Sequence, residues 1–252
     1  MGLNRVFTQR VFHMKMTQEE IDKLINENKR FQIALKGYDL TGVNLAGANL
    51  INADLTESEL TGVNLAGANL TGAKLLGAEL SEVKLTGANL VQANLTSAVL
   101  VGADLMGTIL VKANLNEAKL LGVDLTAARI TGARISHANL THSDLLGADL
   151  SFADLSHSEL ICANLTASNM TGATLESSNL SEAILNESKL ASAKLLSAKL
   201  IKASLLWTDM RYATLIEANL TQADLRGVRY NSETTWPDGF DPKEAGAILT
   251  EY

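Results

Sequence analysis

The ten residues TGVNLAGANL stand at positions 41–50 and recur letter for letter at positions 61–70. Inside this stretch a period of five repeats a leucine that is preceded, two residues earlier, by a small side chain. The period runs without insertion from Leu45 to Leu225 and has 37 central positions, of which 33 are Leu, two are Ile and two are Met. Such a short, unbroken period is typical of a solenoid, in which each repeat contacts only its neighbours.

The five-residue period excludes an α-helix. Each residue turns a helix by about 100°, so a five-residue step turns it by about 140° and spreads the leucines around the whole cylinder. A leucine and the small residue two positions earlier share a face only in extended backbone, because strand side chains alternate. The pair that follows each leucine, such as Thr61 and Gly62, is typical of turns. The pattern predicts short extended pieces joined by turns, with leucine inside and the intervening polar residue, such as Asn49, outside.

The duplication also predicts the size of one coil. Its offset of 20 residues equals four repeats, as expected if a whole coil was duplicated. With 37 repeats at four per coil, about nine coils stacked roughly 4.8 Å apart make a rod on the order of 45 Å long. The backbone amides of each coil are then expected to pair with the coils on either side.

These repeats resemble the pentapeptide-repeat family, whose consensus A(D/N)LxX stands here as ANL, ADL and AKL motifs from about Leu40 to Tyr230. The resemblance implies an all-β fold, a right-handed quadrilateral parallel β-helix in which the leucine fills the core and the small residue closes the corner. The hand of the coil comes from this resemblance alone. The C-terminal tail is similar to the terminal segment of cyanobacterial members of the family.

Both ends of such a rod are expected to carry caps, because a solenoid otherwise exposes its apolar core and unpaired strand edges. We expect four regions along the chain: an unstructured leader over 1–16, an N-terminal helical cap over 17–36, the β-helix over 37–230 and a C-terminal cap over 231–252.

Each cap is predicted to contain a short helix. The helix over 18–29 begins with a capping box, formed by Thr17 and Glu20. Its apolar residues recur at helical spacing and are expected to pack over the first coil: Ile21, Leu24 and Ile25. In the tail, Asp241 followed by Pro242 is typical of a helix start, which predicts a second helix over 242–249.

Composition excludes several classes of protein. The chain has 252 residues, one cysteine (Cys162) and a formal net charge of −7. A single thiol forms neither an internal disulfide framework nor a multi-thiolate metal site, and the negative charge disfavours nucleic acid and anionic membranes as partners. No apolar run reaches the roughly 18 residues of a transmembrane helix and no secretory signal opens the chain, so we expect a soluble, cytoplasmic protein.

Catalysis is also disfavoured. The inward positions of the 37 repeats carry no ionisable side chain, so an arrangement of nucleophile, base and orienting group has no buried place. The frequent glycines follow the five-residue period and do not form a phosphate-binding loop. We expect no enzymatic activity, no catalytic residue and no cofactor.

One polar cluster follows from the 20-residue offset. His137 is expected to stack on His157, and His142 on Cys162, at neighbouring corners of the rod. Imidazole and thiolate suit a borderline or soft metal, but the two columns diverge outward, and solvent-facing corners tolerate any polar residue. We therefore assign no metal ligand and keep both interpretations in view.

An acidic ladder is predicted on one face, where Asp104, Asp124 and Asp144 are 20 residues apart. Some members of the resembled family mimic B-DNA and inhibit DNA gyrase. A duplex of about 45 Å carries about 26 phosphate charges, whereas residues 38–230 hold 19 acidic and 13 basic side chains. Four lysines also make the C-terminal third basic: Lys189, Lys194, Lys199 and Lys202. The charge pattern makes this chain a poor mimic, and we keep gyrase inhibition as the alternative function.

Apolar residues at outward positions are the best candidates for a binding surface, because exposed apolar patches commonly mark interfaces. Two groups stand out. The mid-rod strip lies too far from either end to be hidden by a cap, and we expect it to be the better candidate for partner binding. It consists of Val99, Val101, Met106, Ile109, Val111 and Leu121. The C-terminal patch consists of Leu196, Ile201, Leu206, Trp207, Tyr212 and Ile216, unless the tail folds back over it.

We interpret the chain as a non-enzymatic scaffold, a rigid rod whose side walls bind another protein. The expected oligomeric state is a monomer or a weak dimer formed through the C-terminal patch. The partner is expected to be a protein and neither nucleic acid nor a membrane.

Overall fold

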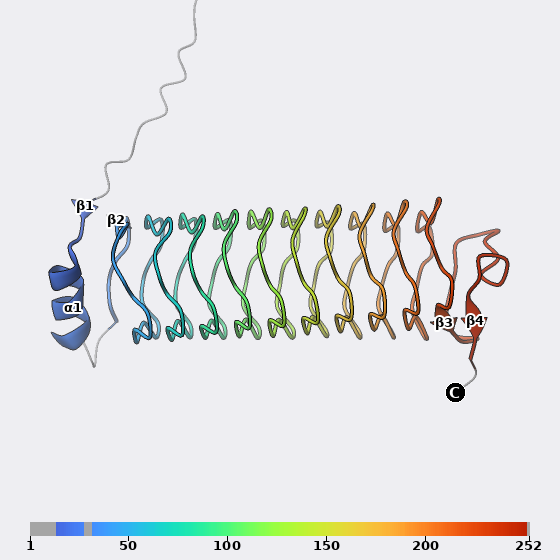
Figure 1. The fold of residues 1–252 in the computed structure, drawn as a ribbon, viewed down its shortest axis with the longest axis horizontal. Helices are drawn as coiled ribbons and strands as arrows, with labels where there is room; N and C mark the ends of the chain where they lie inside the picture. Colours follow the sequence, from blue (N-terminus) through green and yellow to red (C-terminus); the bar gives the residue numbers. More distant parts are fainter. Residues whose placement is uncertain (1–13, 28–31, 251–252) are drawn as a thin grey trace, which may run out of the picture.

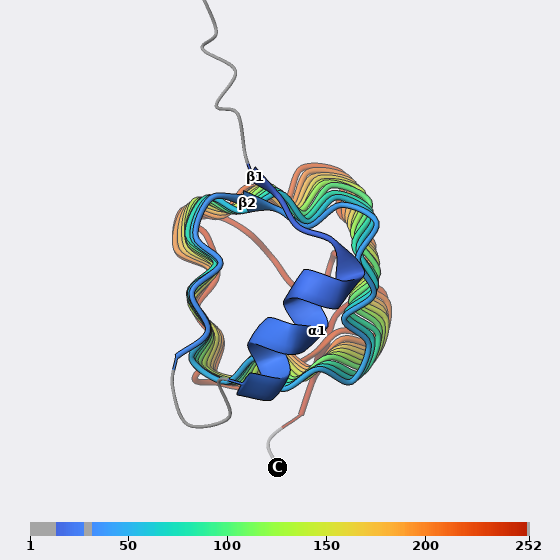
Figure 2. The ribbon, with the colours of Figure 1, turned by 90° about the vertical axis from the view of Figure 1, so that its left-hand side faces the viewer.

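The computed structural model describes residues 14–27 and 32–250, and these form a straight rod of stacked coils (Figure 1). Viewed along its axis the rod has a four-sided outline, with the one helix of the described residues lying across the opening (Figure 2). The elements are β1 (Met14–Lys15), α1 (Gln18–Glu27), β2 (Tyr38–Asp39), β3 (Arg229–Tyr230) and β4 (Ile248–Leu249). Between β2 and β3 the coils are held together by isolated parallel bridges.

The bridges confirm the predicted four repeats per coil. Every bridge from Ala34↔Asp54 to Asp209↔Arg229 joins residues 20 apart in parallel register. Each central residue from Leu45 to Leu215 donates its amide to the chain segment that follows along the rod axis, as Leu45 N does to Asn64 O at 2.8 Å. The main-chain polar groups of the coil are thereby satisfied along the rod axis, which leaves the interior to apolar side chains.

The core is the predicted stack of leucines. All 37 central positions from Leu45 to Leu225 are buried, with exposed fractions of 8% or less. The small residue two positions earlier is mostly alanine. Where it is serine, the hydroxyl usually returns to the backbone, as Ser58 Oγ does to Leu55 O at 2.7 Å, whereas Ser188 Oγ has no hydrogen-bond partner among the described residues. The buried hydroxyl of Ser58 is tolerated because it is hydrogen-bonded.

The corners are tight turns with one left-handed residue. In one such turn, Ala48 N donates to Leu45 O at 3.0 Å. Gly47, the third residue of that turn, has a φ of 67°. This φ sign is the one that a type II turn requires at its third position. At 24 corners the left-handed residue is not glycine, so the ladder bonds of the coil hold many L-residues in a conformation that is costly in isolation.

The outward Asn or Asp of each repeat has a structural role that the sequence analysis did not predict. Its side chain accepts a hydrogen bond from the turn amide two residues later, as Asn64 Oδ1 does from Ala66 N at 3.1 Å. This Asx interaction satisfies the one turn amide that no neighbouring coil reaches. The turn amide of Ser136 instead donates to Asn116 Oδ1, from the preceding coil, at 3.1 Å.

The N-terminal cap combines a strand and a helix. β1 pairs in parallel with β2, and α1 begins with the predicted capping box, in which Thr17 N donates to Glu20 Oε2 at 2.8 Å and Glu20 N to Thr17 Oγ1 at 3.3 Å. Ile21 is fully buried against the core, and Leu24 and Ile25 pack beside it.

The leader was expected to be unstructured over 1–16, but Met14–Lys15 form β1 because the first coil offers an unpaired edge for them. The helix was predicted to reach residue 29, and α1 is described up to Glu27. Residues 1–13 and 28–29 lie outside the described residues.

The C-terminal cap contains no helix over 242–249, so that prediction was wrong. Asp241 does begin a helical turn, because its Oδ1 accepts from Lys243 N at 2.8 Å. The turn ends at Gly246, which has a φ of 89°, and the chain then forms β4 in parallel with β3. The unpaired edge of β3 provides ladder bonds that a short helix could not supply, and tertiary pairing therefore overrides the local signal.

Candidate interaction surfaces

The mid-rod strip winds around the rod and does not lie on a single face. Val101 and Leu121 stack on one corner and both are exposed, Met106 is exposed on the next corner, and Val111 lies half-buried on the one after. Val99 and Ile109 lie half-buried on two different sides, where Val99 pairs with Glu79 and Ile109 with Arg129. The structure thus brings together only parts of this strip.

The C-terminal patch is likewise distributed over all four corners at nearly one level of the rod. Leu196 and Ile216 stack on one corner and both are exposed. Ile201 and Leu206 are half-buried at the next two corners. Trp207 and Tyr212 are the most exposed members, with 63% and 55% of their surface accessible.

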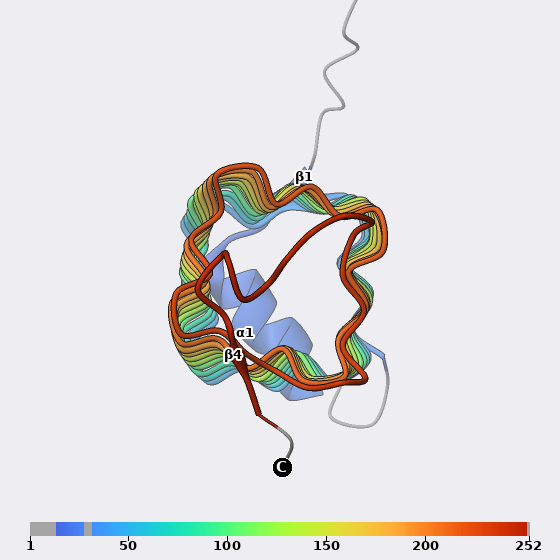
Figure 3. The ribbon, with the colours of Figure 1, turned by 90° about the vertical axis from the view of Figure 1, so that its right-hand side faces the viewer.

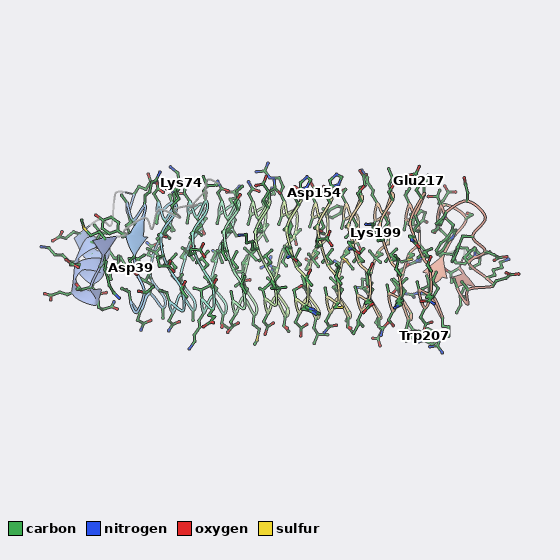
Figure 4. All side chains as sticks on the ribbon, turned by 90° about the horizontal axis from the view of Figure 1, so that it is seen from above. Asp39, Lys74, Asp154, Lys199, Trp207 and Glu217 are labelled. Carbon is green, nitrogen blue, oxygen red and sulfur yellow. The ribbon has the colours of Figure 1, made fainter. Side chains whose placement is uncertain are left out.

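Within the described residues the tail leaves this patch uncovered. It crosses the open end of the rod (Figure 3), where Trp236 packs edge-on against Tyr230, with ring centroids 5.5 Å apart, and stacks on Phe240 at 5.4 Å. Trp207 projects outward from the rod near this end (Figure 4). The tail caps the core, and the side walls keep their exposed aromatic rings.

The ring of Trp207 packs over a glycine that lies 20 residues later in the chain. A Cβ atom at Gly227 would lie 2.5 Å from Cε3 of Trp207. Gly172 plays the same role for Phe152, whose ring carbon Cε1 would lie 2.7 Å from a Cβ atom there. Phe152 is 69% exposed and is a candidate that the sequence analysis left out of both groups. Both aromatic residues could have been found in the sequence, because each is followed 20 residues later by a glycine.

An ionic cluster lies between the corners of Trp207 and Tyr212. The guanidinium of Arg211 binds both carboxylate oxygens of Asp209, with Nε to Oδ1 at 2.9 Å and Nη2 to Oδ2 at 2.6 Å. Arg229 Nη2 is 3.6 Å from the same Oδ2. Burial raises the pKa of Asp209, but the hydrogen bonds from Arg211 and the charges of Arg211 and Arg229 outweigh it, so the pKa lies below its ordinary value.

The sequence analysis did not predict this cluster. Its spacing was visible, because Arg211 is two residues after Asp209 and Arg229 is 20 residues after it. With one carboxylate and two guanidinium groups the cluster has a net positive charge, and rings border it on both sides. Trp, Tyr and Arg are the residue types that dominate binding energies at protein interfaces. The arrangement can therefore anchor a protein partner.

The histidine and cysteine corners do not converge. The rings of His137 and His157 stack with centroids 4.8 Å apart and an angle of 10°. Cys162 Sγ is 3.8 Å from Glu182 Oε2, on a different corner. Among residues 14–27 and 32–250, no three His, Cys, Asp or Glu side chains are grouped as a metal site.

The acidic ladder is present as predicted, since Asp104 pairs with Asp124 and Asp124 with Asp144 along one side. Part of its charge is engaged locally: Asn164 Nδ2 donates to Asp144 Oδ1 at 3.1 Å. The four C-terminal lysines lie on different sides of the rod, because only residues 20 apart stack. Neither sign of charge forms one continuous face. In the described part of the chain, no helix is both long and apolar enough to cross a membrane.

Comparison with known proteins agrees with this architecture. The family model for pentapeptide repeats matches residues 39–77, 73–110, 108–147, 148–186 and 188–227. The chain is similar to the crystal structure of HetL, a pentapeptide repeat protein from the cyanobacterium Nostoc that is involved in heterocyst differentiation regulation. The two sequences are 34% identical, and the match covers 89% of this chain and 99% of HetL with a TM-score of 0.80.

A second solved structure is more distant. QnrB1, a plasmid-mediated fluoroquinolone resistance protein, is 20% identical over 77% of this chain and 90% of its own, with a TM-score of 0.50. At this identity the likeness shows the fold alone. No curated protein sequence matches the chain.

Proposed function

Because the chain belongs to the pentapeptide-repeat family, we propose that it is a non-enzymatic scaffold whose side walls bind another protein. The interior supports this proposal, since leucine and small residues fill it and offer no place for a catalytic group. Family membership also supports the right-handed sense expected for the coil. Binding must then take place on the outer surface.

The observation that carries the proposal is the exposed ring of Trp207. It packs over the backbone of Gly227 and is 63% exposed. A tryptophan ring buries a large apolar area on binding at a low cost in conformational freedom. The neighbouring Asp209–Arg211 pair adds directional polar contacts, which favour one partner over others. We assign the main contact to the side of the C-terminal patch that carries Trp207 and Tyr212, and a secondary contact to the mid-rod strip.

The likeness to HetL supports a regulatory role. HetL is involved in the regulation of heterocyst differentiation and shares 34% of its residues with this chain across nearly its whole length. We infer that this protein also acts in regulation, by holding a partner protein against its wall.

The proposal is tested by partner capture from an extract of the native cell. The wild type is compared with Trp207→Glu and Leu121→Glu, and with Ala167→Glu, which lies on the same corner as Trp207 two coils away. We expect Trp207→Glu to lose the captured protein and Ala167→Glu to retain it. Equal capture by all variants contradicts a binding role for the walls.

The dimer question has a separate test. Sedimentation of the wild type beside Trp207→Glu shows whether the C-terminal patch associates two copies. A wild type that sediments as a monomer removes self-association and leaves the heterologous partner.

Inhibition of DNA gyrase is the alternative. Residues 38–230 have a net charge of −6 from 19 acidic and 13 basic side chains, far below the charge of a duplex of similar length. We therefore place gyrase inhibition second. A supercoiling assay separates the two functions, because dose-dependent inhibition by the purified protein overturns the scaffold proposal.

A further inference from the structure

The last coil has an open strand edge. In the preceding coil, the amides of four residues donate to the coil that follows at 2.8–2.9 Å: Ser197, Leu200, Lys202 and Leu205. The equivalent amides of the last coil donate no hydrogen bond to any residue that the structure describes: Glu217, Leu220, Gln222 and Leu225. We call the backbone from Glu217 to Leu225 the open edge.

The tail closes the edge on both flanks and leaves its middle unpaired. Thr214 pairs with Thr235 at one flank, and β3 pairs with β4 at the other. Between these points the chain leaves the coil and crosses the end of the rod (Figure 3). An open groove of about 450 Å³ lies between the segment 218–221 and the tail segment 237–240.

The opposite end of the rod shows how such an edge is closed. There β1 pairs with β2, and the side chain of Gln18 both donates to and accepts from the backbone of Asn44. Native proteins cover strand edges in this way because an unpaired edge is a template for another strand. The open edge at the C-terminal end retains that capacity.

The side chains around the open edge define what kind of strand fits. The core leucine Leu220 is 8% exposed, the largest value among the central leucines, and Phe240 faces the same groove. Residues 216–226 and 237–244 together carry five acidic and two basic side chains, a net charge of −3. A strand added here presents alternate side chains to the apolar end of the core and to this acidic rim.

We propose that the open edge binds a segment of a partner protein that is extended along each side of the edge and bends with the coil at the turn of Thr221 and Gln222. Along its extended parts, apolar residues alternate with basic ones. The backbone of that segment takes up the unpaired amides and carbonyls, its apolar side chains cover Leu220 and Phe240, and its basic side chains face Glu217 and Asp238. This is strand addition at the end of the rod. It is independent of the side-wall contact proposed above.

The probe is a peptide of alternating valine and lysine, about eight residues long as for an ordinary strand, and its counterpart with glutamate in place of lysine. Binding to the full chain is followed by fluorescence anisotropy, and amide hydrogen exchange is measured residue by residue. We expect the lysine peptide to bind, to slow exchange at Leu220, Gln222 and Leu225 at least tenfold, and the glutamate peptide not to bind.

Matched variants separate edge binding from attraction to the acidic rod as a whole. Glu217 accepts from Ser197 Oγ at 2.7 Å, and Glu117, on the same corner five coils away, accepts from Ser97 Oγ at 3.0 Å. We expect the Glu217→Lys, Asp238→Lys double variant to weaken peptide binding at least tenfold, and Glu117→Lys to leave it unchanged.

Two results overturn the proposal: absence of binding, or binding without slower exchange over 217–225. Equal weakening by Glu117→Lys also overturns it, because attraction would then be general. Trp207→Glu is expected to retain peptide binding, since Trp207 and Glu217 lie on opposite edges of the rod (Figure 4). A failure of strand addition is thus distinguishable from a failure of the side-wall function.

Discussion

The side-chain amide of Gln18 pairs with the backbone of Asn44 as a neighbouring strand would. Gln18 Nε2 donates to Asn44 O at 3.1 Å, and Asn44 N donates to Gln18 Oε1 at 2.8 Å. A second bond, from Nε2 to Asp22 Oδ1 at 2.8 Å, holds the amide in place on α1. Among the described residues no earlier coil precedes Asn44 at this end, and the side-chain amide of Gln18 makes the two hydrogen bonds that a peptide group of such a coil would make.

Removing this amide is expected to weaken the N-terminal end. Gln18→Ala leaves both backbone groups of Asn44 without a partner, and we expect a loss of about 1–2 kcal/mol in unfolding free energy and faster exchange of the Asn44 amide. Gln18→Glu keeps the acceptor and loses the donor, so its effect lies between the wild type and Gln18→Ala. Gln92→Ala, at an exposed corner, is the control. Identical exchange at Asn44 in all variants contradicts the assigned role.

The glycine beneath Trp207 leads to a second prediction. Gly227→Ala and Gly107→Ala both place a Cβ at a residue with positive φ, 75° and 64° respectively, which costs about 1 kcal/mol each. At Gly107 the new atom meets nothing within 4 Å, whereas at Gly227 it displaces the indole ring.

Only Gly227→Ala is therefore expected to change the fluorescence of Trp207. The measurement uses a Trp236→Phe background, so that Trp207 is the one emitting tryptophan. An unchanged spectrum in Gly227→Ala would mean that the ring does not rest on this glycine.

Trp236→Phe should itself be well tolerated. The Nε1 atom of Trp236 is buried and has no hydrogen-bond partner among the described residues, so the substitution removes an unsatisfied donor and keeps a ring between Tyr230 and Phe240. We expect a change within about 1 kcal/mol. Trp236→Ala empties this space and is expected to cost about 3–5 kcal/mol. Thermal unfolding of the two variants compares them, and equal losses would show that ring packing is not what Trp236 contributes.

The leucine stack predicts the cost of core substitutions. Leu125 is 2% exposed and is surrounded by apolar side chains, so Leu125→Asp leaves a buried charge without a partner and is expected to cost several kcal/mol, about 3 or more. Leu125→Met is expected to cost less than about 1.5 kcal/mol, because Met170 and Met210 occupy the central position of other repeats and are fully buried there. Chemical denaturation measures both. A folded Leu125→Asp protein with wild-type stability contradicts the packed core.

Acid is expected to weaken the C-terminal coils through Asp209. Arg211 and Arg229 lower the pKa of this carboxyl in the folded state despite its burial. The resulting stabilisation is complete above the unfolded pKa of about 3.9 and is lost as the pH falls through the lower folded pKa. Glu79 affects the pH dependence of stability in the opposite direction, because burial and the charge of Glu59 raise its pKa.

The pH prediction is checked by comparing unfolding midpoints between about pH 6 and pH 2 in the wild type and in Asp209→Asn. We expect the wild type to lose stability on acidification and Asp209→Asn, already less stable at the higher pH, to lose less. Parallel curves for the two proteins would show that the ion pair does not contribute to the acid sensitivity.

The interior of the rod could be predicted from the amino-acid sequence alone. A leucine every five residues, a small residue two positions earlier and an offset of 20 are enough to predict the coil, its four repeats and its buried residues. The reason is that each repeat contacts only its own turn and the equivalent repeats one coil away. Local periodicity and a single long-range offset therefore describe all of its packing.

The ends and the walls depend on tertiary contacts that are not periodic. Residues 248–249 form a strand because β3 offers an edge, Gln18 fills a gap left by an absent coil, and the tail covers the core but not Trp207 or the amides from Glu217 to Leu225. Each outcome depends on polar groups far apart in the chain that meet only once the coils are stacked. Their pairing is fixed by the need to satisfy backbone hydrogen bonds at an edge, and no local pattern in the sequence expresses that need.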